Sequence, residues 1–442
     1  MRLYESRPMA RRCFLTGAVS VGAGVFGTLA LRPGKSAEIP PAELRNTIAR
    51  VIQTYDRQGF HRTGTDVDRE SARWLAAEAR DRGLQPALES FRVNRVDPRT
   101  TVLQLGDHRI DGVPIFDGSF TDVNGVRGRL GPLDSGAEIG IVPVDVALGA
   151  IGQRGSVNIG PSEFLEIRKT TKHRALVVIA RGESAGITLM NAPNFRSPLG
   201  PPAIQVASGE QELLEASAAR RTGAHVIVHA VRDSAQAFNV TARLPGTDKS
   251  LPPLVVMTPR SGWWHCAAER GGGLACWLEM MRHLRAHRPR RTVEFVASSG
   301  HELGYLGIQA FLSARPGLAH QAVGWIHFGA NVGAAPAVNN LLQASDDRID
   351  RLASESLAEA GIPVNRRAAR GAVPAGEVEL VHRDAGRYVS IIGANRFFHN
   401  PADRWPGAVD VDSIARYILA FNRLAEMLCD DIVVQSGKRS GR

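Results

Sequence analysis

Short apolar runs alternate with stretches of helical spacing in the second half of the chain. The continuous runs at residues 254–257, 293–297, 323–328 and 389–392 predict buried strands. The stretches between and after them predict helices at Gly273–His287, Leu306–Leu312, Ile349–Ala360 and Val411–Leu428. This alternation predicts an α/β core, in which a mixed β-sheet is flanked by helices.

The first half of the chain has a different pattern. Residues 41–56 and 66–82 predict two helices, the second capped by Thr65 or Asp66. Residues 100–235 then hold short apolar runs separated by glycine, aspartate and proline, with one helical stretch at Gln211–Arg220. These runs are Val113–Phe116, Ile139–Val144, Ala175–Ala180, Ala203–Ala207 and His225–His229. The pattern predicts a β-rich lobe inserted into the α/β core.

Residues 1–37 have the parts of an export signal. The pair Arg11-Arg12 precedes a stretch of uncharged apolar and small residues from Thr16 to Leu31, and Arg32 follows it. A basic region, an apolar region and small residues near a cleavage position are typical of a secretory signal peptide, and paired arginines indicate the twin-arginine route. We therefore expect a periplasmic or extracellular protein, attached to a membrane only if the signal stays uncleaved.

The charge balance changes once this segment is set aside. The 442 residues carry a net charge of +10, but residues 1–37 hold six Lys and Arg against one Glu, which leaves +5 for the remainder. The net charge of residues 38–442 is so small that it does not indicate a nucleic-acid partner. Of the four cysteines, Cys13 lies in the signal, and the odd number that remains argues against a disulfide framework.

Four segments resemble one family, the two-zinc aminopeptidase-like metallopeptidases of the leucyl aminopeptidase and glutamate carboxypeptidase type. They are His61–Thr65 with Trp74-Leu75, Asn239–Gly246, Phe295–Gly307 and Phe398–Asp403. The insert, with Leu199–Ile204 and Gly223–Val226, is similar to the protease-associated domain that many members carry. The resemblance implies a peptidase-like core at 38–100 and 236–435 with an insert at 101–235, between the signal peptide at 1–37 and a basic tail at 436–442.

The resemblance also implies a metal site, and this sequence departs from its pattern. In the family, two zinc ions are held by a His, a bridging Asp, a second Asp, the second Glu of a Glu-Glu pair and a late His, and the first Glu of the pair is the general base. The corresponding positions here are, in the same order, Arg260, Glu269, Ala330, Glu302 and His399, with His301 at the position of the base. Three of the ligand positions therefore keep side chains that bind metal.

The resemblance then implies at most one zinc ion, held by Glu269, Glu302 and His399 with a fourth position open. His301 would act as the base, and Arg260 would bind a substrate carboxylate or the developing oxyanion. His265 and His327 are possible additional site residues. Arg260 cannot bind metal, so we expect it beside Glu269, in place of the first ion.

Three functions stay open at this point. The first is an exported exopeptidase-type hydrolase with a single-zinc site, acting on a peptide or a small carboxylate-bearing substrate. The second is a catalytically inactive binding protein in which Arg260 replaces the first metal, because the family includes members without peptidase function. The third is a metal-free hydrolase that uses Arg260, His265 and Glu269. Glu269 also has a purely structural alternative, an ion pair with Arg260 or Arg270.

Overall fold

A computed structural model describes residues 41–146, 159–335 and 339–430. Within these residues one sheet has the strand order β13-β12-β14-β11-β9-β10-β8-β4-β5-β6-β7-β3, and β1 and β2 join it at β8. The strands of its α/β part are β8 (Gly223–Leu244), β9 (Leu254–Pro259), β10 (Val293–Ser298), β11 (Gly324–Phe328), β12 (Asn340–Ala344), β13 (Arg366–Arg367) and β14 (Tyr388–Gly393). The pairs β10–β9, β9–β11 and β11–β14 are parallel, whereas β8–β10 and β12–β14 are antiparallel, so the sheet is mixed as expected.

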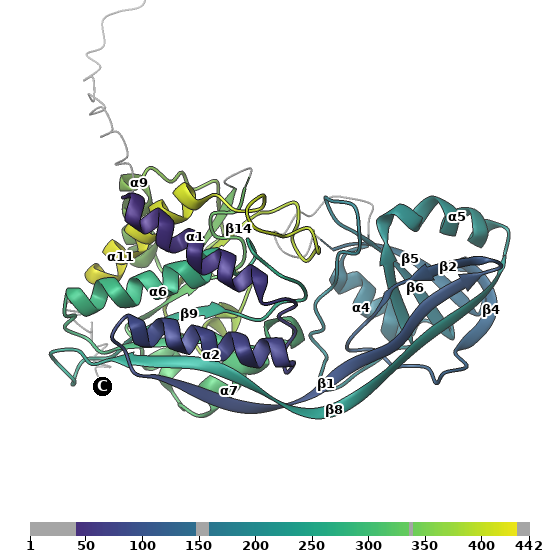
Figure 1. Ribbon diagram of the computed structural model, residues 1–442, viewed down its shortest axis with the longest axis horizontal. Coiled ribbons are helices and arrows are strands. Elements are labelled where there is room, and N and C mark those ends of the chain that lie inside the picture. The colour runs from purple at the N-terminus through teal and green to yellow at the C-terminus, as the bar shows by residue number, and fades with distance from the viewer. Residues whose placement is uncertain (1–40, 147–158, 336–338, 431–442) are drawn as a thin grey trace, which may run out of the picture. The chain divides into compact units, whose positions relative to one another are not determined.

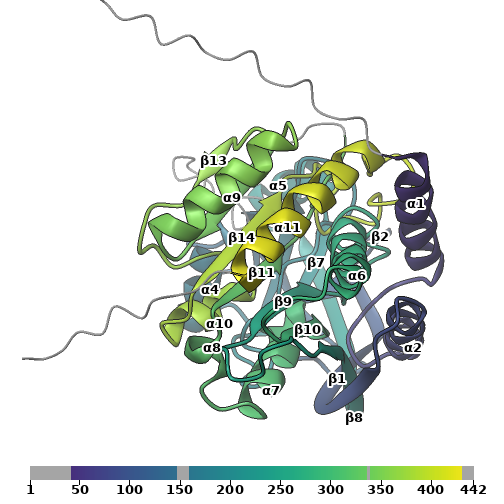
Figure 2. The same ribbon diagram turned by 90° about the vertical axis from the view of Figure 1, so that its left-hand side faces the viewer.

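Helices cover both faces of this part of the sheet (Figure 2). One face carries α1 (Ala42–Arg57), α2 (Asp66–Asp81), α6 (Gly271–Ala286), α9 (Asp347–Glu359) and α11 (Val411–Asp430). The other carries α7 (Leu306–Ser313), α8 (Leu318–Gln321) and α10 (Val378–Arg383). Strand β9 shows why both faces are covered, because Leu254 and Val256 pack on the first side while Val255 and Met257 pack on the second.

The segment predicted as an insert is rich in strands. It contains β2 (His108–Asp111), β3 (Val113–Pro114), β4 (Val126–Pro132), β5 (Ile139–Asp145), β6 (Ala175–Arg181) and β7 (Ala203–Ala207), with helices α4 (Pro161–Thr170) and α5 (Gln211–Ala219). The central strands β4, β5, β6 and β7 are parallel neighbours, and their side chains form separate hydrophobic clusters.

Two long strands connect this segment to the α/β part. Strand β1 (Pro86–Leu105) pairs antiparallel with β8 along almost its whole length, as Figure 1 shows. The sequence-based boundaries at residues 101 and 235 fall inside these two strands, so the chain passes from one part to the other without a linker. No helix of the described residues is long and apolar enough to cross a membrane. The expected export signal lies outside the described residues.

Candidate functional site

The residues singled out by the resemblance lie at the carboxyl ends of parallel strands. Arg260 directly follows β9, and His301 and Glu302 follow β10 through the turn at Ser299-Gly300. Gly300 has a φ of 82°, a left-handed conformation that glycine adopts without steric cost. In α/β folds, ligands bind at this end of the strands because loops from several strands meet there.

A buried arginine joins the two carboxylates expected to hold metal. Arg270 Nη2 lies 2.8 Å from Glu269 Oε1 and 2.7 Å from Glu302 Oε1. All three side chains are almost completely buried. Burial alone would raise the pKa of Glu269, but the charge of Arg270 and hydrogen bonds from neighbouring side chains outweigh it and lower the pKa to about 2. Arg270 therefore neutralises carboxylate charge that the family neutralises with metal.

Neutral donors satisfy the remaining oxygens of this ion-pair cluster. Ser261 Oγ donates to Glu302 Oε2 at 2.8 Å, and Cys266 Sγ donates to Glu269 Oε2 at 3.3 Å. Arg270 Nε donates to the Ser261 carbonyl at 2.7 Å, which fixes the guanidinium in place. Asp403 accepts the backbone N–H groups of residues 268 and 269 at 2.8 and 2.9 Å, and so it positions the segment that carries Glu269.

His399 completes the group of expected ligands. Its Nε2 lies 3.3 Å from Glu269 Oε1, and its Nδ1 is 2.7 Å from the Leu189 carbonyl. Its φ is 57°, and Cys266, Tyr305 and Asn331 also have positive φ values. Non-glycine residues held in this region cost free energy and concentrate at binding and catalytic sites. The structure thus joins Glu269 and Glu302 through one nitrogen atom of Arg270 and places His399 against Glu269. Their role as metal ligands stays a prediction.

A zinc ion does not fit among these side chains as they stand. A guanidinium cannot lose its proton in a protein, so Arg270 remains a cation. A dication about 4 Å away would be repelled by roughly 8 kcal/mol at an effective dielectric constant near 20. The described residues contain one group of three His, Cys, Asp or Glu side chains whose donor atoms all lie within 4.8 Å, and it is a different one, His283, His287 and Glu426.

The prediction that Arg260 lies beside Glu269 is wrong, because Arg260 pairs with a different carboxylate. Its Nη1 lies 2.9 Å from Asp68 Oδ1, and its guanidinium also donates to the carbonyls of Asp68 and Phe238. Arg260 is fully buried and does not line the cavity described below. Of the two arginines that the sequence left open as partners of Glu269, the structure pairs Arg270 with it and Arg260 with Asp68.

His301 belongs to a second buried cluster. Its Nδ1 lies 3.5 Å from Glu377 Oε1, and Glu377 also accepts hydrogen bonds of 2.6 and 2.7 Å from Ser298 Oγ. Burial lowers the pKa of His301 to about 3, so its imidazole is neutral at pH 7 but a weak proton acceptor. Glu377 was not found from the sequence, because it lies more than seventy residues from its partners and belongs to no motif.

The two additional histidines have separate environments. His327 is buried, with Nδ1 at 2.8 Å from Ser390 Oγ and with no hydrogen-bond partner for Nε2. His265 Nδ1 bonds to the Asp56 carbonyl at 2.7 Å, and its ring packs on Phe60. The contacts of Arg260, His265 and Glu269 thus lead to three different partners, and the metal-free hydrolase built from these residues stays a hypothesis.

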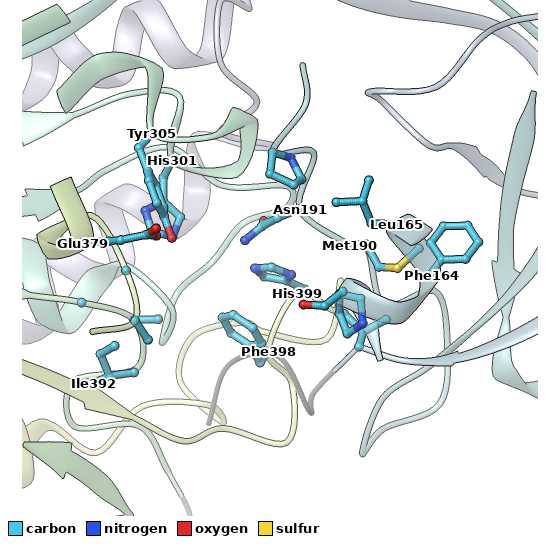
Figure 3. A pocket seen from close by; sticks show the side chains of 18 of the residues that line it. Phe164, Leu165, Met190, Asn191, His301, Tyr305, Glu379, Ile392, Phe398 and His399 are labelled. Atoms are coloured by element: carbon cyan, nitrogen blue, oxygen red, sulfur yellow. The ribbon is translucent and has the colours of Figure 1, made fainter. Parts of the chain in front are cut away.

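A cavity of about 420 Å³ opens beside these groups. In Figure 3, His301, Tyr305 and Glu379 gather at one side, Asn191, Phe398 and His399 lie in the middle, and Phe164, Leu165 and Met190 lie opposite. His327 and Ala330 also line it. Such a cavity, mostly apolar with a few polar groups, has the size and character of a small-molecule site.

No family model matches the chain, and no curated protein matches its sequence. Its structure is similar to that of BSAP, a zinc aminopeptidase from Bacillus subtilis, with a TM-score of 0.69 and 14% identity over 90% of this chain and 97% of the other. A peptidase M28 precursor from Shewanella amazonensis matches with a TM-score of 0.65 and 13% identity over 88% and 97% of the two chains. An aminopeptidase from Aneurinibacillus sp. strain AM-1 matches with a TM-score of 0.64 and 13% identity over 88% and 94%.

The chain therefore has the fold of the zinc aminopeptidases, as the resemblance implied. The match with BSAP covers 90% of this chain, so the similarity also includes most of the segment 101–235. Identities of 13–14% show a shared fold and do not show a shared chemistry of the site.

Proposed function

We propose that this chain is a metal-free binding protein built on the aminopeptidase fold. One observation carries the proposal: Arg270 Nη2 contacts both Glu269 and Glu302, and the third expected ligand, His399, contacts Glu269. A hydrolytic zinc ion needs these three side chains, and a fixed cation already lies among them. The inactive alternative raised by the sequence is thus retained, with Arg270 in the role assigned to Arg260.

The ligand we propose is a peptide end or a small molecule with one apolar side chain, bound in the cavity of about 420 Å³. Phe164, Leu165 and Met190 offer apolar surface, while the unpartnered Nε2 of buried His327 offers a hydrogen bond. We do not propose a preference for a carboxylate, because Arg260, the residue expected to bind it, pairs with Asp68. Arg168, which also lines the cavity, is bound to Asp117 at 2.7 Å.

Metal content and hydrolysis test the first part of this proposal. The protein, purified with zinc present, should hold no zinc that depends on His399, and it should not release nitroanilide from leucyl or phenylalanyl substrates. A zinc ion that is lost in His399→Ala, together with hydrolysis that is lost in the same variant, would establish the single-zinc hydrolase instead.

Ligand binding tests the second part. Leucyl and phenylalanyl dipeptides are suitable probes, followed by calorimetry or by the unfolding temperature. Ala330→Phe should abolish binding because its ring would fill the cavity that Ala330 lines. Ala369→Phe adds the same volume at an exposed position and should leave binding unchanged. Equal binding by the two variants would rule out this cavity as the site.

Export through the twin-arginine route is part of the same proposal. It is supported by Arg11-Arg12 ahead of an apolar stretch. Three further cysteines, Cys266, Cys276 and Cys429, are free and buried, so no disulfide among them has to form after export.

A further inference from the structure

We propose a second, surface metal site formed by His283, His287 and Glu426, which binds a divalent ion of the nickel–copper–zinc group. Their donor atoms all lie within 4.8 Å of one another. His283 and His287 are four residues apart at the end of α6, and Glu426 lies on α11, which packs beside α6 (Figure 2). His283 lies in the last turn of α6 and His287 is its C-cap residue, and the two imidazoles are neighbours.

The hydrogen bonds already orient the rings for a metal. His287 Nδ1 lies 2.9 Å from the His283 carbonyl, which can only accept, so this nitrogen carries the proton and Nε2 keeps a free lone pair. A ligating histidine commonly donates its other N–H to a carbonyl in this way. The two rings are 4.4 Å apart between centroids and inclined by 31°, close enough to share one ion.

The acidic ligand is already in contact with the first histidine. His283 Nε2 lies 2.7 Å from Glu426 Oε1, and an ion would take the place of the hydrogen between them.

Nearby arginines are held elsewhere. Arg282 pairs with Glu279 at 2.6 Å, and Arg423 pairs with Glu359. Among the ion pairs of the described residues, the carboxylate of Glu426 therefore pairs with His283 alone.

Two imidazoles and one carboxylate are ligands that suit zinc, nickel and copper, and water can complete the coordination. The bound ion would link the end of α6 to α11. Because a ligand that binds only the folded state stabilises it, the ion should also raise the unfolding temperature.

The test uses the full chain without a polyhistidine tag, titrated with Zn²⁺ by calorimetry and with Co²⁺ by visible absorption. We expect one ion per chain and a rise in unfolding temperature that EDTA reverses. His287→Ala and Glu426→Gln should each weaken binding at least about 10-fold, since even the loss of an outer-shell partner costs that much. His320→Ala removes another exposed histidine and should change nothing.

Two results would overturn the proposal. One is no Zn²⁺ or Co²⁺ binding beyond that of His287→Ala. The other is binding that His287→Ala and Glu426→Gln leave intact. Binding that these two variants keep but His399→Ala loses is an example of the second result. It would place the ion at Glu269, Glu302 and His399 instead. The two proposals therefore fail independently, because one depends on His287 and the other on His399.

Discussion

Replacement of Arg270 by alanine should turn the candidate site into a zinc site. The substitution removes the cation and leaves Glu269, Glu302 and His399 around the vacated space. Glu269 and Glu302 are almost fully buried, so their charges cannot be compensated by solvent. Breaking a buried ion pair by removing one partner typically costs about 3–5 kcal/mol of unfolding free energy. Because Arg270 contacts two carboxylates, we expect a loss at the upper end of this range.

Zinc should restore much of that stability in Arg270→Ala and add none at this site in the unchanged protein. At a zinc concentration about 100 times the dissociation constant, binding returns about 2.7 kcal/mol. The assay is urea unfolding with and without zinc, in a His287→Ala background so that the surface site does not contribute. The count of zinc ions per chain is measured on the same samples.

Arg260→Ala is the matched control. Like Arg270, Arg260 is fully buried and forms an ion pair, in this case with the single carboxylate of Asp68 at 2.9 Å. Its loss should destabilise the protein comparably, but zinc should not rescue it, because among the described residues Asp68 is the one carboxylate paired with Arg260. Equal zinc rescue of the two variants, or none in either, would refute the idea that Arg270 takes the place of the metal.

Three further predictions concern other parts of the chain. Arg11→Lys with Arg12→Lys should leave unprocessed precursor in the cytoplasm, as seen by fractionation; unchanged export would indicate the general secretory route. Gly272→Ala should lower the unfolding free energy by about 3 kcal/mol or more, because its Cβ would lie 1.8 Å from the Val332 carbonyl oxygen, whereas Gly407→Ala meets nothing within 4 Å and should cost far less in urea unfolding. Arg270→Lys keeps a cation at the site and should not gain zinc by elemental analysis, so a zinc ion in this variant would contradict the charge argument.

Four strands of the α/β part could be predicted because each is buried on both faces. Strands β9, β10, β11 and β14 are continuous apolar segments between helices, and their position needs no knowledge of distant neighbours. The long strand β1 was not predicted, and of β8 only the run His225–His229 was. Many of their side chains are polar and partly exposed, and each is stabilised mainly by pairing with the other across more than a hundred residues of sequence.

The candidate site shows a different limit. The spacing of the motifs brought Glu269, Glu302 and His399 together as ligand positions, but it could not decide which arginine lies among them. Arg260 occupies the position of a lost ligand and was the natural choice, yet it leaves β9 toward Asp68 on α2, whose carboxylate no motif indicates. Arg270 stands next to Glu269 in the sequence and turns back to hold both carboxylates. A zinc ion can exchange and bind water, whereas an arginine is covalently fixed and offers only hydrogen-bond donors. Under the proposed function, the arginine that balances the charge of this site therefore also leaves the site without a means of activating water.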